Sequence, residues 1–181
     1  VLFSIPIKEN SPNLKRFHLA SAGVVLLSSI YLLIQVFQNT ITNPSSQIQL
    51  LYETKLNWLN AISAKYFIGI DALSSMMLVL AAIIIFTGIL ATWRLEKGQK
   101  VFLGFFQILA ASVYGVFISF DLVLFFVFYE MEALCMYLLI AGYGSGNKDY
   151  GAKKLTLTLA IGSSMILAVF LGIYAETGTW N

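Results

Sequence analysis

Five long stretches with almost no charged side chains constrain the fold of this chain more than any other feature. They are Leu19–Phe37, Ala72–Trp93, Val101–Phe120, Leu122–Tyr143 and Leu155–Ala175. A helix needs roughly 20 mostly apolar residues to cross a bilayer. Core helices of soluble proteins keep a polar face, which these stretches lack. The sequence therefore predicts an all-α fold, a polytopic transmembrane helical bundle with about five full spans.

The composition supports the same class of protein. Hydrophobic residues make up 59% of the chain and charged residues 11%, whereas soluble domains carry about 25% charged residues. The net charge is only +2 and the basic residues form no long run, so we expect no nucleic-acid partner. A single cysteine excludes an intramolecular disulfide framework. The lipid bilayer is the partner that this composition predicts.

The first ten residues, VLFSIPIKEN, place an apolar run before the charges. A signal peptide has the reverse order. We expect this segment to be the end of a partial first span whose beginning is missing. Residues 1–181 would then form a single membrane domain.

The charges in the connecting loops predict how the chain is oriented across the membrane. If the loop from Arg94 to Lys100 is cytoplasmic, nine of the eleven Lys and Arg residues fall on the cytoplasmic side. Only Lys55 and Lys65 fall on the other side. This asymmetry is what the positive-inside rule predicts for short loops. The nine inner residues are Lys8, Lys15, Arg16, Arg94, Lys97, Lys100, Lys148, Lys153 and Lys154.

Residues 39–69 form the one long loop, which we expect on the extracytoplasmic side. Its first part is rich in turn-forming residues, and the segment LLYETKLNWLNAI is mildly amphipathic. The loop is either an ordinary connector or contains an interfacial helix or hairpin. In the second case Leu51, Trp58, Leu59 and Ile62 would lie on the membrane surface.

Glu130 lies near the middle of its predicted span, where a charged group costs upward of about 2.5 kcal/mol. Such residues usually face a protein interior or a water-filled cavity and mark an ion or proton path. The alternative is a neutral carboxylic acid that only joins helices by a hydrogen bond. Burial disfavours the charged carboxylate, and a nearby Lys or Arg favours it. A carboxyl group balanced between these influences can load and release a proton near neutral pH.

Glu132 follows two residues later, which is a rotation of about 200° around a helix. The two glutamates therefore point in nearly opposite directions and are not expected to share one proton. Either both sides of the helix meet protein or water, or Glu132 faces a subunit contact.

The remaining polar residues have simpler explanations. Lys153 and Lys154 begin the last span, where basic side chains reach back to the inner interface. Asp71 and Asp121 precede spans and are expected to cap them. His18, beside two basic residues, is expected at the interface rather than on a metal.

No pattern in the chain indicates a bound cofactor. Cys135 has no His or second Cys near it in sequence, so we expect no metal site. The segment GYGSGN follows a membrane helix and lacks the ending of a phosphate-binding loop. No redox centre is expected in this chain itself.

The segments FFVFYEMEALCMYLLI and DYGAKKLTLTLAIGSS resemble the antiporter-like membrane subunits of respiratory complex I, most closely the M-type (chain 4-type) subunit. The segment FIGIDALS is similar to the Gly-x-Asp-Gly-x-Ser start of an earlier helix in that family, and SFDLVLFF is similar to the entry to its glutamate helix. The resemblance covers essentially the whole chain.

The resemblance implies roles for individual residues. Glu130 matches the proposed proton-path glutamate, Glu132 the second acid of photosynthetic and many bacterial members, and Lys154 the lysine of a Tyr-Ala-Ala-x-Lys segment. Tyr129 replaces the usual Trp, and Cys135 replaces a proline, so the kink that proline would impose is not assured. The lysine partner of the glutamate would lie beyond Asn181, which makes this chain the N-terminal part of a longer subunit.

The resemblance also implies a function, stated here as an expectation. The chain would be a proton-translocating membrane subunit of a complex I-type NADH:quinone oxidoreductase. Other membrane-arm subunits would be its partners, and NADH, FMN, Fe–S clusters and quinone would bind in partner subunits. We expect a bacterial inner membrane, with a mitochondrial inner membrane or thylakoid as the alternative. The alternative functions are a subunit of a multi-subunit Na+/H+ antiporter or of a membrane-bound hydrogenase-type complex, and a fragment that is only a membrane scaffold.

Overall fold

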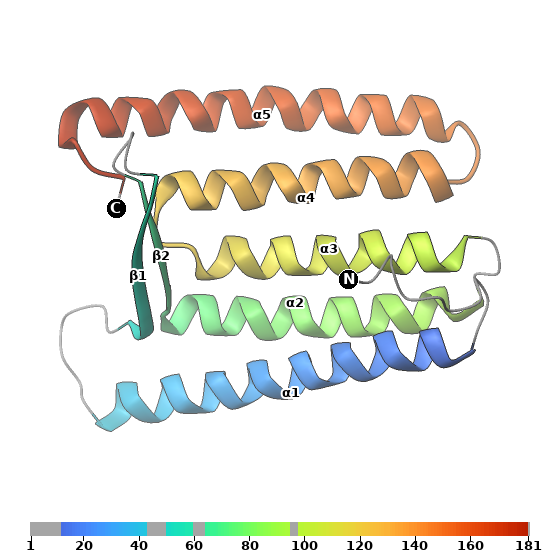
Figure 1. Cartoon of the computed structure of the whole chain (residues 1–181), viewed down its shortest axis with the longest axis horizontal. Helices are drawn as coiled ribbons and strands as arrows, with labels where there is room; N and C mark the ends of the chain where they lie inside the picture. Colours follow the sequence, from blue (N-terminus) through green and yellow to red (C-terminus); the bar gives the residue numbers. More distant parts are fainter. Residues whose placement is uncertain (1–11, 43–49, 60–63, 95–97, 181) are drawn as a thin grey trace. The chain divides into compact units, whose positions relative to one another are not determined.

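The computed structural model describes residues 12–42, 50–59, 64–94 and 98–180, which are mostly helical (Figure 1). Five of its helices are long and apolar enough to cross a membrane, which confirms the predicted bundle. The expected partial first span falls in residues 1–11, outside the described part of the chain. The elements in order are α1 (Pro12–Thr42), β1 (Leu51–Leu59), β2 (Ala64–Ile70), α2 (Ala72–Ala91), the 3-10 helix η2 (Thr92–Arg94), α3 (Gln99–Ile118), α4 (Leu122–Tyr143) and α5 (Lys148–Thr177).

Two helices extend well beyond their predicted spans. α1 was expected over Leu19–Phe37 and runs over Pro12–Thr42, and α5 was expected over Leu155–Ala175 and runs over Lys148–Thr177. A charged residue ends the apolar stretch but not the helix, because long charged side chains reach water while the backbone stays helical. Lys153 and Lys154 therefore lie within α5 rather than at its start.

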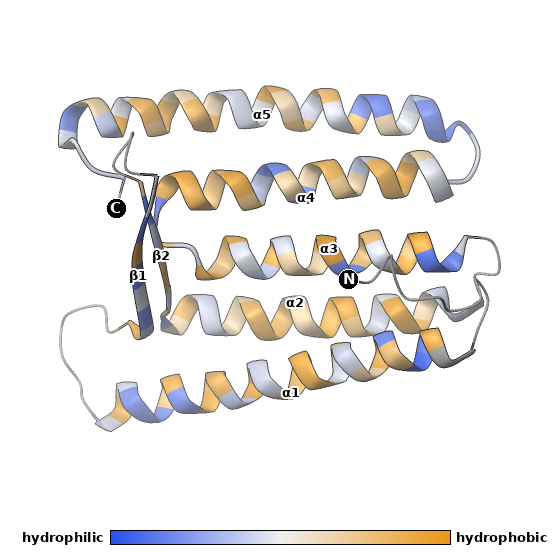
Figure 2. Ribbon diagram, viewed as in Figure 1, coloured by the Kyte–Doolittle hydropathy of each residue, from blue (hydrophilic) through white to orange (hydrophobic). Residues whose placement is uncertain are grey.

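Hydropathy follows the helices in the expected way. Figure 2 shows apolar residues along the middle of the helices, and hydrophilic residues toward several helix ends and on β1. Backbone polar groups inside a bilayer must be satisfied within the segment itself, which helices achieve.

Contacts divide the chain into two compact units. The first comprises residues 1–51 and 70–110, and the second residues 52–69 and 111–181. In the first unit α1 packs along α2, as Figure 1 shows. Lys15 Nζ donates a hydrogen bond of 2.5 Å to the carbonyl of Trp93. The start of α1 and the end of α2 therefore lie at the same end of this unit, as alternating spans require.

Asp71 caps α2 as predicted. Its side chain accepts a hydrogen bond of 2.7 Å from the backbone N–H of Ser74, whose hydroxyl accepts one of 2.9 Å from the N–H of Asp71. This reciprocal capping box satisfies two backbone donors that the first helical turn leaves free.

The second unit contains β1 and β2, the end of α3, and the helix pair α4–α5. α4 and α5 pack along each other, and the rings of Phe125 and Phe170 meet edge to face with centroids 6.0 Å apart. The two strands pair in a two-stranded sheet, and Ile68 of β2 bridges to Ser119 after α3.

The strand pair corrects one alternative for the loop over 39–69. Residues 51–59 form a strand, so the interfacial helix is wrong for this segment. The hairpin named as the other form of this segment agrees with the pairing of β1 and β2. Of the residues expected on the membrane surface, Ile62 and the side chain of Leu59 lie outside what is described. Trp58 is 45% exposed, and its membrane contact stays a prediction.

Close packing between α3 and α4 predicts a stability effect. A Cβ placed on Gly115 would lie 2.5 Å from Cγ of Phe128, which no real contact tolerates. We expect Gly115→Ala to destabilise the protein by about 1–3 kcal/mol through overpacking. The midpoint of thermal unfolding in detergent measures this.

Gly162→Ala is the matched control, because a Cβ there meets nothing within 4 Å. Alanine also has a helix propensity up to about 1 kcal/mol better than glycine. An equal midpoint for the two variants would contradict the packing described for Gly115.

Candidate functional site

Glu130 lies in the middle of α4, where Figure 2 shows a hydrophilic interruption in an apolar helix. Its Oε1 is buried and has no hydrogen-bond partner. Among the described residues it is the one buried side-chain nitrogen or oxygen atom without a hydrogen-bond partner. More than nine in ten buried polar groups find a partner, so an exception calls for a specific explanation.

A cavity of about 450 Å³ adjoins this carboxyl group. Apart from Glu130, only Tyr137 and Thr156 contribute polar side chains to its lining. The Thr156 hydroxyl already donates to the carbonyl of Ala152, one turn earlier in α5. Lining residues come from one face of α4 and the facing side of α5: Phe126, Val127, Glu130, Met131, Ala133, Leu134, Tyr137, Thr156, Leu159 and Ala160.

The cavity leaves space beside the carboxyl group of Glu130. A water molecule occupies about 30 Å³ in the liquid, so a few waters fit beside the carboxyl group. A buried carboxyl oxygen needs a proton, a water or a cation as its partner, because leaving it unpaired in an apolar place is costly.

Glu132 lies on another face of α4. Phe128 packs against Gly115 of α3, and Glu132 follows Phe128 by one helical turn on the same face. The side chain of Glu132 thus turns toward α3, while Glu130 borders the cavity beside α5. The structure does not bring the two glutamates into one site, as the rotation of about 200° between them requires.

Lys154 does not line the cavity. It is exposed on α5, and it precedes the cavity residue Thr156 by two positions, a rotation of about 200° that turns it away. The described residues form no ion pair between Lys154 and Glu130. Its neighbour Lys153 is exposed as well.

Sequence reasoning did not identify two of the contacts that the structure shows. His18, expected at the interface, is only 2% exposed, and its Nδ1 lies 3.5 Å from Oε1 of Gln107 on α3. Asp121 caps α4 as predicted, but it also binds a strand residue far away in sequence. Both partners lie more than fifty residues away, so no local pattern could have identified them.

Clusters of metal ligands are not found in the part of the chain that the structure describes, where no three His, Cys, Asp or Glu residues come together. Cys135 is a free, buried thiol. The candidate site is thus a single carboxyl group beside a cavity.

Water in the cavity can be tested with engineered thiols. Cys135 is only 1% exposed, so the native chain gives little background. We expect Ala160→Cys to react with a charged, water-soluble thiol reagent in membranes, because only a hydrated thiol forms the reactive thiolate. The reaction is followed by mass spectrometry.

Ala168→Cys is the control for this experiment, since it lies two turns further along α5 and does not border the cavity. We expect it to react several times more slowly. Equal rates at the two positions would show that the cavity has no special access to water.

Comparison with known proteins shows which family the chain resembles. Residues 119–181 match the family model described as NADH:quinone oxidoreductase/Mrp antiporter, TM. The chain is 32% identical over 82% of its length to NAD(P)H-quinone oxidoreductase chain 4 1 of Picosynechococcus sp., covering 28% of that protein. It is 30% identical over 96% of its length to the chloroplastic chain 4 of Mesostigma viride, covering 33% of it. The chain thus spans about 30% of the length of these relatives.

A solved structure shares the fold. A chain of respiratory complex I from Thermus thermophilus with bound NADH aligns with a TM-score of 0.78 at 23% identity, covering 92% of this chain and 33% of that chain. The apolar helices confirm the predicted integral membrane location. Cyanobacterial and chloroplast relatives indicate a bacterial or thylakoid membrane. The chain is therefore similar to the chain 4 subunits of NAD(P)H-quinone oxidoreductase, and its residues 119–181 match the NADH:quinone oxidoreductase/Mrp antiporter family.

Proposed function

We propose that this chain is part of a proton-translocating membrane subunit of a complex I-type NADH:quinone oxidoreductase, with Glu130 as its proton-binding group. The observation that carries the proposal is the buried, unpartnered Oε1 of Glu130 beside a cavity in the middle of a membrane helix. Ionisable groups at that depth commonly belong to proton relays.

The proposed mechanism needs only a carboxyl group and a movable positive charge. A water in the cavity would bring a proton to Glu130. The approach of a basic group would draw that proton away again. The family resemblance supplies such a group as a lysine on a further helix.

Electron transfer would occur elsewhere in the assembly. NADH, FMN, Fe–S clusters and quinone would bind in partner subunits, and other membrane-arm subunits would contact this one. Quinone reduction would then change the electrostatic potential along the membrane arm. This chain would respond through the charge state of Glu130.

Lys154 and Glu132 have secondary roles in this proposal. Lys154 lies outside the cavity on an exposed part of α5, where it can face another helix of the assembly. Glu132 faces α3 and offers a second proton-binding group on the other side of α4. Neither residue touches the Glu130 carboxyl group, so each would act through longer-range electrostatics.

Replacement of Glu130 by Gln tests the proposal. The amide keeps the size and hydrogen-bonding capacity of the side chain but cannot release a proton. We expect the complete oxidoreductase that carries Glu130→Gln to assemble and to lose proton translocation. Acidification of proteoliposomes during quinone reduction measures it.

Glu176→Gln is the matched control, because Glu176 is exposed near the end of α5. It should translocate protons as the unmodified complex does. Full translocation by Glu130→Gln would refute the assignment.

The two adjacent lysines of α5 provide a further test. Lys154 matches the lysine of the family segment and Lys153 does not. We expect Lys154→Ala to lower the translocation rate severalfold and Lys153→Ala to leave it near normal, in the same proteoliposome assay. Equal effects would assign both residues to orientation at the inner interface.

The alternative function is a subunit of a Na+/H+ antiporter without electron transfer, which the description of the matched family also covers. The subunits that co-purify with the chain distinguish the two. Iron–sulfur subunits favour the oxidoreductase, and small membrane subunits alone favour the antiporter.

A further inference from the structure

Asp121 uses its two carboxylate oxygens for two different partners. Oδ1 accepts hydrogen bonds of 2.9 Å and 3.1 Å from the backbone N–H groups of Val123 and Leu124, which caps α4. Oδ2 accepts one of 3.0 Å from the backbone N–H of Lys65 in β2. The residue is 1% exposed. One buried side chain thus joins the start of α4 to the strand pair.

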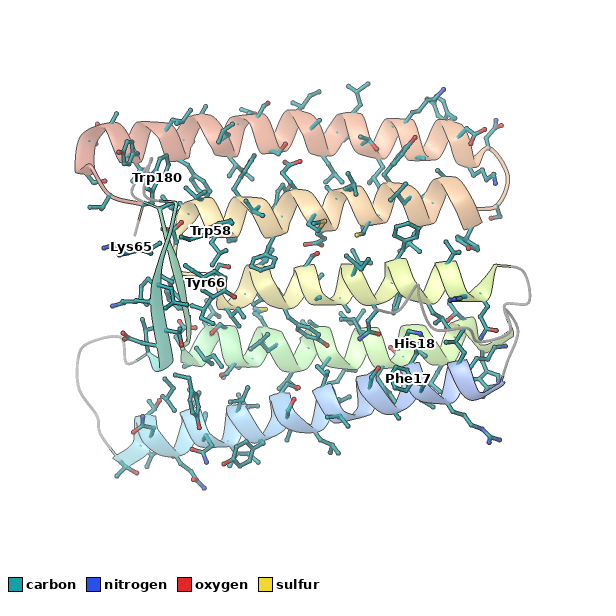
Figure 3. All side chains as sticks on the ribbon, in the orientation of Figure 1. Phe17, His18, Trp58, Lys65, Tyr66 and Trp180 are labelled. Atoms are coloured by element: carbon teal, nitrogen blue, oxygen red, sulfur yellow. The ribbon has the colours of Figure 1, made fainter. Side chains whose placement is uncertain are left out.

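Backbone hydrogen bonds hold the residues on either side of Asp121. The N–H of Phe120 donates to the carbonyl of Phe67, and the N–H of Leu122 donates to the carbonyl of Trp180, both at 2.9 Å. The Trp180 ring stacks on Tyr174 near the end of α5, with centroids 4.2 Å apart. In Figure 3, Lys65 and Trp180 lie at the end of this unit where α4 begins.

The hydrogen bonds of Phe120, Asp121 and Leu122, here called the clamp, hold the start of the helix that carries Glu130. Glu130 follows Asp121 by nine positions, which corresponds to about 13 Å along the helix axis and two and a half turns. A hydrogen-bonded helix is stiff over that length. The clamp therefore sets the position of the Glu130 side chain along the helix axis and its rotation about that axis. A rotation of α4 would change which face meets the cavity.

We infer that Asp121 is a positioning residue for Glu130: its bridge from the α4 cap to strand β2 fixes the register in which Glu130 meets its cavity. This inference rests on the proposed function of Glu130. Capping alone would require only Oδ1. The bond from Oδ2 to Lys65 is the part that the helix itself does not need.

Asp121→Asn separates the two bonds. The amide oxygen can still accept from Val123 and Leu124, but the amide nitrogen is a donor and cannot accept from Lys65. The variant therefore keeps the cap and loses the bridge to β2. Asp71→Asn is the matched control, because in the described chain the side chain of Asp71 accepts only within its own capping box.

The first readout is modification of Glu130 by a hydrophobic carbodiimide, which attacks protonated carboxyl groups, in the complete complex. The pH of half-maximal labelling is measured by mass spectrometry. Tyr137 is the other titratable side chain in the cavity lining, and it is unchanged in all variants. The second readout is the rate of proton translocation.

We expect Asp121→Asn to shift the labelling profile along the pH axis and to lower translocation by about tenfold, since a misplacement of about 1 Å can cost as much as 100-fold in rate. Asp71→Asn should change neither readout. A complex with Asp121→Asn that shows the unmodified labelling profile would overturn the inference, even if less of it assembles.

If Asp121→Asn does not assemble, Lys65→Pro removes the same bond from its other side, because proline has no backbone N–H. Its control is Lys65→Ala, which keeps the backbone N–H. Lys65→Pro should shift the labelling profile and Lys65→Ala should not, and equal profiles would again overturn the inference. Labelling does not depend on translocation, so a failure of the proposed function would be recognised separately, by full translocation in Glu130→Gln.

Discussion

The cost of placing polar groups in hydrocarbon determines how this chain is built. Every backbone N–H and C=O inside the bilayer needs a partner, so the apolar stretches become helices. The same cost is why the unpartnered carboxyl oxygen of Glu130 calls for a specific explanation. Its unpaired Oε1 and the adjoining cavity together describe a site that accepts a proton, a water or a cation.

The acidic residues of helix α4 and its cap differ in the helix face they occupy and in their position along the helix axis. Glu130 meets the cavity beside α5, and Glu132 turns toward α3 next to the tightly packed Phe128. Asp121 lies at the end of the helix, where its carboxylate receives three backbone donors. The proposed proton-binding group therefore lies on a helix whose start is held by hydrogen bonds to β2.

Local patterns predicted much of this arrangement. The span Leu122–Tyr143 was predicted with the bounds that α4 has, and Asp71 and Asp121 were predicted as caps, because apolar length and capping residues act within a few positions. The start of α5 at Lys148 was not predicted, since helices continue past the apolar stretch. The contact of His18 with Gln107 and the bond from Asp121 to Lys65 join residues more than fifty positions apart, which local patterns do not reveal. The cavity beside Glu130 likewise depends on how α5 packs, which a single helix does not encode.

The protonation of Glu130 during turnover is the central claim, and infrared difference spectroscopy observes it directly. A protonated carboxyl group has a C=O stretching band that disappears when the proton leaves. The account predicts such a band in the difference spectrum of the working complex, and predicts its loss when Glu130 is replaced by Gln. A spectrum that keeps the band unchanged in the Glu130→Gln complex would contradict the account.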